Sequence, residues 1–252
     1  MIDAYISDIA AALRSLGVRP GGSLLVHSSL RALGRVPGGA ETVVRGLLAA
    51  LGEDGTLLLP ALSYELVRSS NPVFDVRGTP SNVGLIPEHF RLRPGTQRSI
   101  HPTHSVCAVG PRAEHLLGAH LEDSTPVGPH SPFRRLRDAG GQILMLGCSL
   151  RPNTSMHGVE ELVEPHYLFG EPLTYRLTLW DGSVIAKTYR RHGFQGWEQR
   201  YDRVGEVLRE PHLKEGPVLA AQCHLIEAAA LWDAAEAALR RDPLYFVDRV
   251  PG

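Results

Sequence analysis

The sequence has few cysteines and almost no net charge. Its three cysteines, Cys107, Cys148 and Cys223, are odd in number and form no Cys-x-x-Cys pair, which argues against a disulfide framework and excludes a zinc ribbon. With 26 basic and 27 acidic residues, the formal net charge is -1. The chain therefore lacks the excess of Lys and Arg that nucleic-acid binding requires.

The sequence also lacks a long hydrophobic run. No apolar segment approaches the roughly 18 residues that a membrane-spanning helix needs, and the N-terminal residues show an amphipathic helix pattern in place of a secretion signal. We therefore expect a cytoplasmic protein, a monomer or homodimer, with no membrane or nucleic-acid partner. A polycationic ligand stays compatible with the composition, because local acidic clusters do not show in a net charge.

What the sequence does contain is an alternation of helical and strand patterns. Apolar residues recur at spacings of three and four between Ile2 and Leu16, which predicts an amphipathic helix that ends before Gly17. This alternation favours an α/β layered fold, with helices flanking a central sheet that is at least partly parallel. Further strands are predicted at 23–27, 55–60, 104–109 and 142–146, and further helices at 40–51, 85–92, 112–120 and 155–164.

The later part of the chain predicts a mixed sheet. Residues 173–180 and 183–189 flank Asp181-Gly182, a dipeptide that is typical of a β-hairpin turn. Helices are predicted at 197–209 and 222–240. No repeat or linker interrupts the chain, so we expect one domain over residues 1–252.

The segment 147–161, GCSLRPNTSMHGVEE, is the most informative for chemistry. It follows a predicted buried strand, which is where α/β proteins usually bind ligands. His157 and Glu160 are three residues apart, so they share a face of the next helix. A carboxylate that fixes the ring tautomer makes a histidine a suitable general base. The spacing alone nevertheless favours an ordinary surface pair, because it often occurs by accident.

His27, Ser28 and Ser29 follow the first predicted strand. Hydroxyl and backbone N–H groups at such a position can face a phosphate. The glycines of a Walker or dinucleotide loop are missing. A capped strand end without a ligand is therefore an equal interpretation.

Two histidines, His101 and His104, lie with Arg98 and several hydroxyl residues in the segment 98–105. Neither His-Glu-x-x-His nor His-x-His occurs in the chain, so we predict no metal site there. Arg98 could pair with a phosphate, but the segment favours an interior His101, a strand-capping His104 and a solvated Arg98.

Acidic residues accompany these segments. A cleft in which several of them converged would attract a ligand with several ammonium groups, although each one taken singly is an ordinary solvated carboxylate. Cys148 follows a strand and could accept an acyl group, but a small buried thiol is its commoner role. The acidic residues are Glu65, Asp75, Glu122, Asp123, Glu160, Glu161 and Glu164.

Motifs along nearly the whole chain support a more specific interpretation. They are LLVHSSLRALG (24–34), GTLLLP (55–60), TPSNVGLIPEHFR (79–91), PGTQRSIHP (94–102), HSP (130–132) and LGCSLRPNTSMHGVEE (146–161). In this order they resemble the aminoglycoside 3-N-acetyltransferase family. The later segments KEGPV (214–218) and RDPLYF (241–246) most resemble the branch that includes apramycin-acetylating enzymes.

The resemblance implies the α/β fold of the antibiotic N-acetyltransferases, which differs from the common GNAT fold. Residues 31–36 approach the GNAT loop R-x-x-G-x-[GA] but end in Val36. The resemblance further implies acetyl-coenzyme A as the donor, the 3-amino group of the 2-deoxystreptamine ring of an aminoglycoside as the acceptor, and antibiotic resistance as the outcome. We expect no metal cofactor.

The resemblance also assigns residues. His157 falls on the catalytic histidine of the family, and Glu160 on the acidic position beside it. We expect His27 to be the third catalytic residue. Cofactor contacts are expected from Ser28, Ser29, Leu30, Arg98 and Ser99. Substrate contacts are expected from Glu65, Asp75, Asp123, His130, Asn153 and Glu161.

The expected mechanism is direct transfer in a ternary complex and not transfer through Cys148. His157 takes the proton as the amine attacks the thioester, and Glu160 or Asn153 orients the imidazole ring. His27 and nearby backbone N–H groups, or less directly His130, stabilise the negative charge on the thioester oxygen.

The chain departs from the family pattern in two places. Gly158-Val159 replaces a bulky apolar residue and Ala, and the segment 190–194, RRHGF, is basic where related sequences can be acidic. The second departure leaves the range of antibiotics open.

Three alternatives remain at the level of sequence. The same fold could acetylate a different amine. A zinc-dependent hydrolase could use His101, His104 and His157. A non-catalytic module could bind coenzyme A without turnover.

Overall fold

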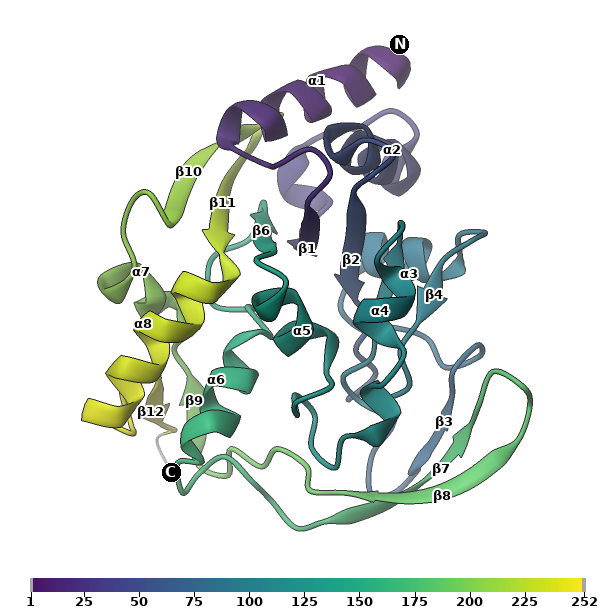
Figure 1. Ribbon diagram of the computed structural model, residues 1–252, viewed down its shortest axis with the longest axis vertical. Coiled ribbons are helices and arrows are strands. Elements are labelled where there is room, and N and C mark those ends of the chain that lie inside the picture. The colour runs from purple at the N-terminus through teal and green to yellow at the C-terminus, as the bar shows by residue number, and fades with distance from the viewer. Residues whose placement is uncertain (1, 251–252) are drawn as a thin grey trace.

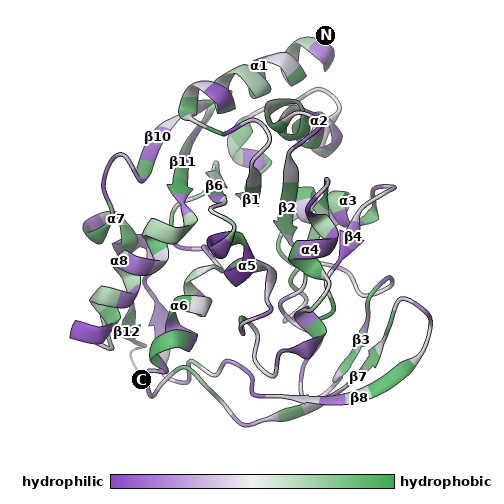
Figure 2. Cartoon of the chain, in the orientation of Figure 1, coloured by the Kyte–Doolittle hydropathy of each residue, from purple (hydrophilic) through white to green (hydrophobic). Residues whose placement is uncertain are grey.

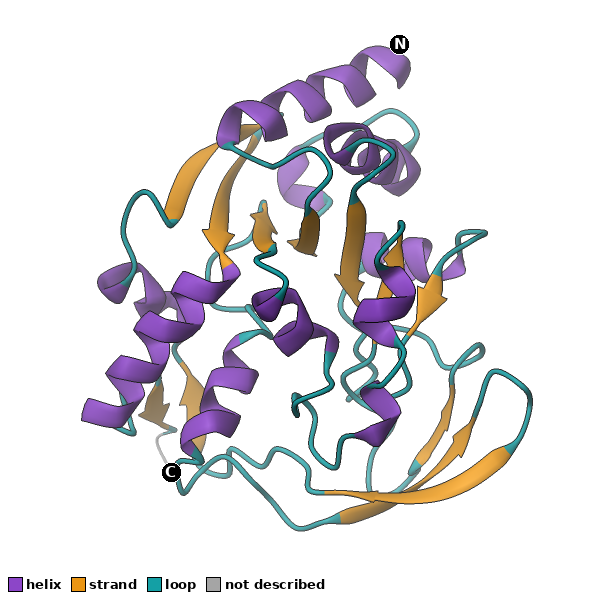
Figure 3. Cartoon of the chain, viewed as in Figure 1, coloured by secondary structure: helices purple, strands orange, loops and turns teal. Residues whose placement is uncertain are grey.

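The computed structural model describes residues 2–250 and confirms an α/β layered fold (Figures 1 and 3). Its central sheet has seven strands in the order β10-β11-β6-β1-β2-β5-β4. These strands are β1 (Ser23–Ser28), β2 (Thr56–Pro60), β4 (Gln97–Arg98), β5 (Val106–Val109), β6 (Gln142–Leu146), β10 (Leu213–Val218) and β11 (Ala221–Glu227).

Parallel pairing lies at the centre of this sheet. β1 pairs in parallel with β2 on one side and with β6 on the other. The pairs β2–β5, β4–β5, β6–β11 and β10–β11 are antiparallel. The sheet is therefore mixed, as predicted, and the carboxyl ends of three adjacent parallel strands meet at one edge, where α/β folds usually bind ligands.

Alternate residues of the central strands pack on opposite faces of the sheet. Leu24 and Val26 of β1 pack with α1 (Ile2–Leu16), α2 (Gly39–Leu51) and α3 (Leu85–Leu92). Leu25 packs on the other face, as the two-residue period of a strand requires. That face is covered by α4 (Ala113–Leu117), α5 (Pro132–Asp138), α6 (Met156–Val163), α7 (Val204–Val207) and α8 (Ala228–Arg241).

Hydropathy follows these layers. β2 and β6 are buried along their whole length, as strands covered on both faces should be. In Figure 2, hydrophobic colour follows β2 and β11, whereas α8 alternates between hydrophobic and hydrophilic colour. That alternation fits a helix with one buried and one exposed face.

Two smaller sheets lie outside the central one. The predicted hairpin is confirmed: β7 (Leu173–Thr178) pairs antiparallel with β8 (Val184–Tyr189). It joins β3 (Val73–Asp75) in a three-stranded sheet and not the central sheet, on the side of the molecule away from α8 (Figure 1). β9 (Trp197–Gln199) pairs with β12 (Val247–Arg249).

Two helix predictions were wrong over part of their length. Residues 221–227 form β11, and α8 begins only at Ala228. Ala221, Cys223 and Leu225 are buried and alternate with more exposed residues, which is the period of a strand. In the segment 197–209, only α7 is α-helical, preceded by β9 and a short 3₁₀ turn. Within residues 2–250, no helix combines the length and apolar character that crossing a bilayer requires.

Candidate active site

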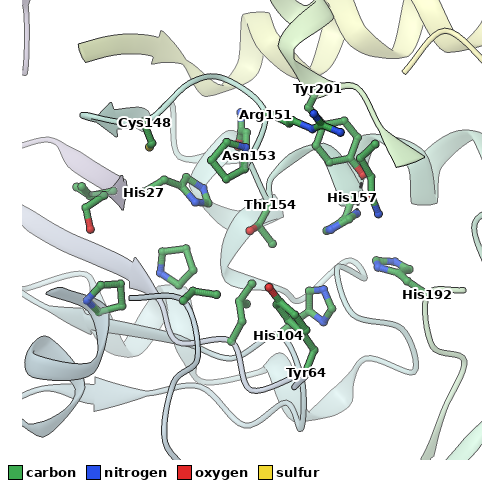
Figure 4. Close-up of a pocket in the computed structure, with 18 of the residues that line it drawn as sticks. His27, Tyr64, His104, Cys148, Arg151, Asn153, Thr154, His157, His192 and Tyr201 are labelled. Carbon is green, nitrogen blue, oxygen red and sulfur yellow. Dashed lines mark hydrogen bonds between the residues drawn. The ribbon is translucent and has the colours of Figure 1, made fainter. Parts of the chain in front are cut away.

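A cavity of about 500 Å³ opens at the carboxyl edge of the three parallel strands (Figure 4). His27 and Ser28 end β1, Pro60 ends β2, and Cys148 follows β6, and all four line the cavity. The other walls come from the segments 62–64 and 83–87, from the turn before β5, from the segment that leads into α6 and from the segment 192–201. The cavity is therefore built from segments that are far apart in the sequence.

A glycine turn at the end of β6 shapes one wall. Gly147 has a φ of 70°, a conformation that favours glycine. A Cβ at this position would lie 2.8 Å from the Cβ of Ala32. The Ser29 N–H donates to the Leu146 carbonyl oxygen at 2.9 Å beside this turn. The close approach brings Cys148 over the end of β1.

The start of α6 is fixed by side chains. The Asn153 Oδ1 accepts a hydrogen bond from the Ser155 N–H at 3.2 Å. The Ser155 Oγ accepts one from the Trp232 Nε1–H of α8 at 2.8 Å, in the core. These bonds hold the first turn of α6, and hence His157, at the cavity wall.

His157 and Glu160 form a hydrogen-bonded pair with two tyrosines. The His157 Nδ1 lies 3.2 Å from the Glu160 Oε2, and the Glu160 side chain is fully buried. The Tyr201 hydroxyl lies 2.7 Å from the same carboxylate oxygen and 2.9 Å from the His157 Nδ1. The Tyr167 hydroxyl donates to the Glu160 Oε1 at 3.1 Å. With Nδ1 engaged, the Nε2 of His157 is the ring atom left for proton transfer.

A second histidine–carboxylate pair lies beside the first. The His192 Nε2 is 2.8 Å from the Glu161 Oε1, and both side chains are almost fully buried. Glu161 also accepts hydrogen bonds from the Thr125 hydroxyl and the Val127 N–H. Burial raises the pKa of Glu161 to about 7, against these donors, and burial lowers the pKa of His192 well below its ordinary value.

Three imidazoles surround one part of the cavity (Figure 4). The ring centroids of His157 and His192 are 4.7 Å apart, those of His104 and His192 5.3 Å, and those of His104 and His157 5.5 Å. Burial lowers the pKa of His104 well below its ordinary value, with smaller effects from His192 and His157. The structure thus gathers histidines from three separate segments around the candidate base.

Polar atoms without protein partners mark the other part of the cavity. Among the described residues, the His27 Nε2, the Ser28 Oγ and the Asn153 Nδ2 are buried and have no hydrogen-bond partner. Buried polar atoms are almost always hydrogen-bonded, so these three unpaired atoms in one part of the cavity point to a polar ligand there. Burial, with a smaller effect of His157, lowers the pKa of His27 to about 3. His27 is therefore a neutral ring that can donate one hydrogen bond.

Cys148 lines the cavity as a protonated thiol. Burial raises its pKa to about 12, and Cys223 adds to the rise. A nucleophilic cysteine needs a lowered pKa, because the thiolate is the reactive form. This environment favours the direct transfer expected from the sequence.

Arg98 and Ser99, expected to contact the cofactor, lie in the interior away from the cavity lining. All the guanidinium donors of Arg98 bond to carbonyl or hydroxyl oxygens of the protein, including the carbonyl oxygens of Thr79 and Ala61. The Ser99 hydroxyl bonds to the His120 Nδ1 at 2.9 Å. Both side chains therefore bond to other protein atoms in the interior, which is a structural role.

Two other expected cofactor contacts also lie outside the lining. The Ser29 Oγ accepts a hydrogen bond from the Ala32 N–H. Leu30 packs against the core between the sheet and α1 and α2. Of the residues 28–30, Ser28 is the one that reaches the cavity.

Of the expected substrate residues, Asn153 lies in the cavity lining and the others lie outside it. Glu161 lies behind His192. Asp123 bonds to the N–H and the Nδ1 of His130 and closes a loop. Asp75 accepts hydrogen bonds from the backbone N–H groups of residues 77 and 78. Glu65 is exposed and follows Tyr64, which lines the cavity.

Two residues at the centre of the site were not expected from the sequence as site residues. His192 lies in the RRHGF segment, in which the two arginines were the notable feature of the sequence because of their charge. Tyr201 lies in a 3₁₀ turn more than 40 residues from His157 (44 positions along the chain). No local motif signals either residue, because each reaches the cavity only through the tertiary fold.

Sequence comparison with known proteins points to one family. The sequence profile described as aminoglycoside 3-N-acetyltransferase matches residues 25–240. Aminoglycoside N(3)-acetyltransferase IV from Salmonella sp is 33% identical, over 96% of this chain and 89% of its own length. Aminoglycoside N(3)-acetyltransferase III, also from Salmonella sp, is 35% identical over 87% of this chain and 86% of its own.

Solved structures of aminoglycoside acetyltransferases are also similar to this chain. The apoenzyme of aminoglycoside acetyltransferase AAC(3)-IVa has a TM-score of 0.80 at 32% identity and covers 96% of this chain and 90% of its own. A mutant of that enzyme in complex with a gentamicin has a TM-score of 0.79 at 31% identity, over 95% and 90%. AAC-IIIb in a binary complex with CoASH has a TM-score of 0.83 at 26% identity, over 98% of both chains. The cavity at the sheet edge, the His157–Glu160 pair and these similarities agree, and the chain belongs to the aminoglycoside 3-N-acetyltransferase family.

Proposed function

We propose that this protein transfers the acetyl group of acetyl-coenzyme A to the 3-amino group of the 2-deoxystreptamine ring of an aminoglycoside, and thereby confers resistance. The observation that carries the proposal is the His157–Glu160 pair, hydrogen-bonded at 3.2 Å on the wall of the cavity. The related structures with CoASH and with a gentamicin support a site that takes both substrates. We also propose that the chain acts as one domain, because the family profile spans residues 25–240 without a break.

The donor would enter over the ends of the parallel strands. Acetyl-coenzyme A supplies an acetyl group that is activated as a thioester. The orphaned Ser28 Oγ and Asn153 Nδ2 give this part of the cavity polar contacts, and the apolar side chains of Val26 and Leu62 line it as well. The pantetheine arm of acetyl-coenzyme A, in which two amides separate apolar methylene groups, fits such a mixed surface.

His157 acts as the general base. An ammonium group has no lone pair, so the acceptor amine must lose a proton before or during attack on the acetyl carbonyl. The His157 Nε2 takes that proton, while Glu160 holds Nδ1 and favours the imidazolium that forms. Tyr201 and Tyr167 fix the carboxylate and are positioning residues.

His27 stabilises the developing negative charge on the thioester oxygen. Its ring is neutral and its Nε2 has no partner among residues 2–250. A preorganised donor at such a place strengthens its bond as charge develops, which lowers the barrier. Cys148 takes no covalent part, because its thiol is protonated at neutral pH.

The acceptor would occupy the opposite part of the cavity. Tyr64 and Phe194 offer flat apolar faces to a sugar ring, and Gln199 offers an amide. Glu65 adjoins Tyr64 in sequence, is exposed, and is the candidate partner for a further ammonium group. Arg190 of the basic segment already pairs with Glu164, so its charge is balanced within the protein.

The test is thiol release from acetyl-coenzyme A with apramycin, with gentamicin and without an acceptor. We expect release that depends on the aminoglycoside. His157→Ala and Glu160→Gln should each lower kcat by about 10²-fold or more, with little change in KM for either substrate. His115→Ala, which alters an exposed histidine, is the matched control.

Two outcomes would contradict the proposal. Coenzyme A binding without release for any aminoglycoside would point to another amine or to a binding module. Full activity of the folded His157→Ala variant would remove His157 from the role of base.

A further inference from the structure

His104, His157 and His192 each have one ring nitrogen held by a neighbouring side chain. The His157 Nδ1 bonds to Glu160, and the His192 Nε2 bonds to Glu161. The His104 Nδ1 bonds to the Thr103 hydroxyl at 2.8 Å. A histidine that ligates a metal ion usually has its second ring nitrogen held by a carboxylate or another hydrogen-bonding group, which orients the ring.

The opposite nitrogens are left for a ligand. The His192 Nδ1 is buried and has no hydrogen-bond partner in the described part of the chain, and the His192 side chain is only 6% exposed. One ring nitrogen from each of the three histidines lies within 4.8 Å of one from each of the others. All three rings line the cavity, so a fourth ligand has access from the cavity side (Figure 4).

These distances suit a small ion after a modest adjustment. Zinc–nitrogen bonds of about 2.0–2.1 Å in a tetrahedral site place the ligand nitrogens roughly 3.3 Å apart. The separations are at most 4.8 Å, so the widest has to close by up to about 1.5 Å to reach roughly 3.3 Å. Three imidazoles with an open fourth position are a donor set that zinc accepts.

We propose that His104, His157 and His192 bind one Zn²⁺ ion and that this ion inhibits the enzyme. The metal would take the His157 nitrogen that accepts the proton, and it would occupy the space of the attacking amine. Zinc is thus an inhibitor of acetyl transfer and not its cofactor. The inhibition rests on the proposed role of His157, whereas the binding of the ion does not.

The binding test uses purified wild-type protein and Zn²⁺ in competition with a coloured zinc chelator. We expect one Zn²⁺ per chain. His104→Ala and His192→Ala should each weaken binding at least tenfold. Glu161→Gln should weaken it about 10–100-fold, because it changes the carboxylate that orients His192 and leaves the three ligands in place. His115→Ala and Cys148→Ser are the controls and should bind as the wild type does. Co²⁺ in place of Zn²⁺ should give the visible absorption of a tetrahedral site, and His192→Ala should lose it.

The inhibition test follows acetylation of gentamicin by mass spectrometry with added Zn²⁺ and then with a chelator. Reversible loss of activity at the zinc concentration that saturates binding is expected. Equal zinc affinity in wild type, His104→Ala and His192→Ala would overturn the site. Zinc binding with full acetylation would overturn the inhibition. Wild-type protein that binds zinc but acetylates no aminoglycoside even without zinc would count against the proposed function and leave the metal site standing.

Discussion

Neighbouring carboxylates of α6 have different roles because their surroundings differ. Glu160 accepts from two tyrosines and faces His157, whereas Glu161 faces His192 and a loop. Both are nearly inaccessible to solvent. Position on the helix decides which histidine each one orients. The structure therefore joins consecutive residues to two different histidines, which the sequence spacing of His157 and Glu160 alone could not show.

Arg98 distinguishes a structural role from a cofactor contact. Its guanidinium donors bond to Ser105, Ser63 and three backbone carbonyls, and the residue is 3% exposed. Lysine cannot reproduce this planar set of donors. We expect Arg98→Lys to lower the free energy of unfolding by about 3 kcal/mol or more, because buried carbonyls lose their partners. Chemical denaturation measures this loss.

The KM for acetyl-coenzyme A separates the two roles. In the structural role, the folded fraction of Arg98→Lys keeps the wild-type KM within about twofold, and Arg31→Lys, an exposed control, changes neither quantity. A KM that rises tenfold with unchanged stability would instead place Arg98 in contact with the cofactor.

At the scale of residues, the sequence predicted some of the residues that line the cavity and missed others, such as His192 and Tyr201. His27 and Ser28 end β1, Asn153 precedes α6 and His157 lies in its first turn. All four line the cavity. The acidic residues were harder to place, because a carboxylate such as Asp75 bonds to its own loop as readily as to a ligand. Local sequence does not distinguish these two uses.

Among the elements, α6 and α8 meet at Gly158, one of the two departures from the family pattern. A Cβ at Gly158 would lie 2.5 Å from the Trp232 Cζ2 and 2.7 Å from the Val127 Cγ1. The Trp232 ring therefore occupies the space that a side chain would take. This contact explains why the helix that carries His157 has glycine here.

Gly158→Ala should lower the free energy of unfolding by about 1–3 kcal/mol through overpacking, although alanine favours a helix by up to about 1 kcal/mol. It should also lower kcat, because α6 must shift with His157. Thermal unfolding and thiol release measure the two effects. In a Trp232→Phe background, the stability cost of the substitution should shrink.

Gly205→Ala is the matched control for Gly158→Ala, because it places the same side chain on a helical glycine. Gly205 lies in α7, and a Cβ at this position would lie at an ordinary 3.5 Å from the Leu150 Cδ1. We expect it to be neutral or slightly stabilising. Equal effects of the two substitutions would mean that Trp232 does not crowd Gly158.

Element prediction succeeded where periodicity was regular. Residues 85–92 and 142–146 match α3 and β6, and the hairpin at Asp181-Gly182 is confirmed. It failed at residues 222–227, because a strand that runs directly into a helix leaves no turn residue between the two patterns. The separate sheet of β7 and β8 was also not foreseen, since the sequence does not reveal which sheet a hairpin joins.

Across the whole molecule, buried neutral histidines couple stability to pH. Burial is the main cause that lowers the pKa of each of five histidines, to about 3 for His27 and His120. The other three are lowered well below their ordinary value, and they are His101, His104 and His192. The unfolded chain protonates these rings below about pH 6.5, whereas the folded chain does not. Their contribution to stability is therefore present at neutral pH and is lost as the pH falls.

We expect the free energy of unfolding to fall by several kcal/mol between pH 6.5 and 5, since each ring contributes up to about 1.4 kcal/mol per pH unit. Glu161 opposes this trend, because its raised pKa of about 7 gives stability that is lost as the pH rises toward 7. Urea denaturation across this range measures the slope.

A single substitution checks the source of this slope. His120→Asn removes one ring and should reduce the slope by about one proton, while the surface variant His115→Ala should leave it unchanged. A flat profile between pH 5 and 7 would contradict the assignment of neutral buried rings.

The four imidazoles of the cavity are spread along the chain from residue 27 to residue 192. They come together only after the central strands pair and after α6 packs on α8. Contacts between such distant segments form slowly, because long loops have to close first. A newly synthesised chain therefore lacks the contact between α6 and α8 until α8 has left the ribosome. The complete set of cavity residues is therefore assembled only after a delay set by translation and folding.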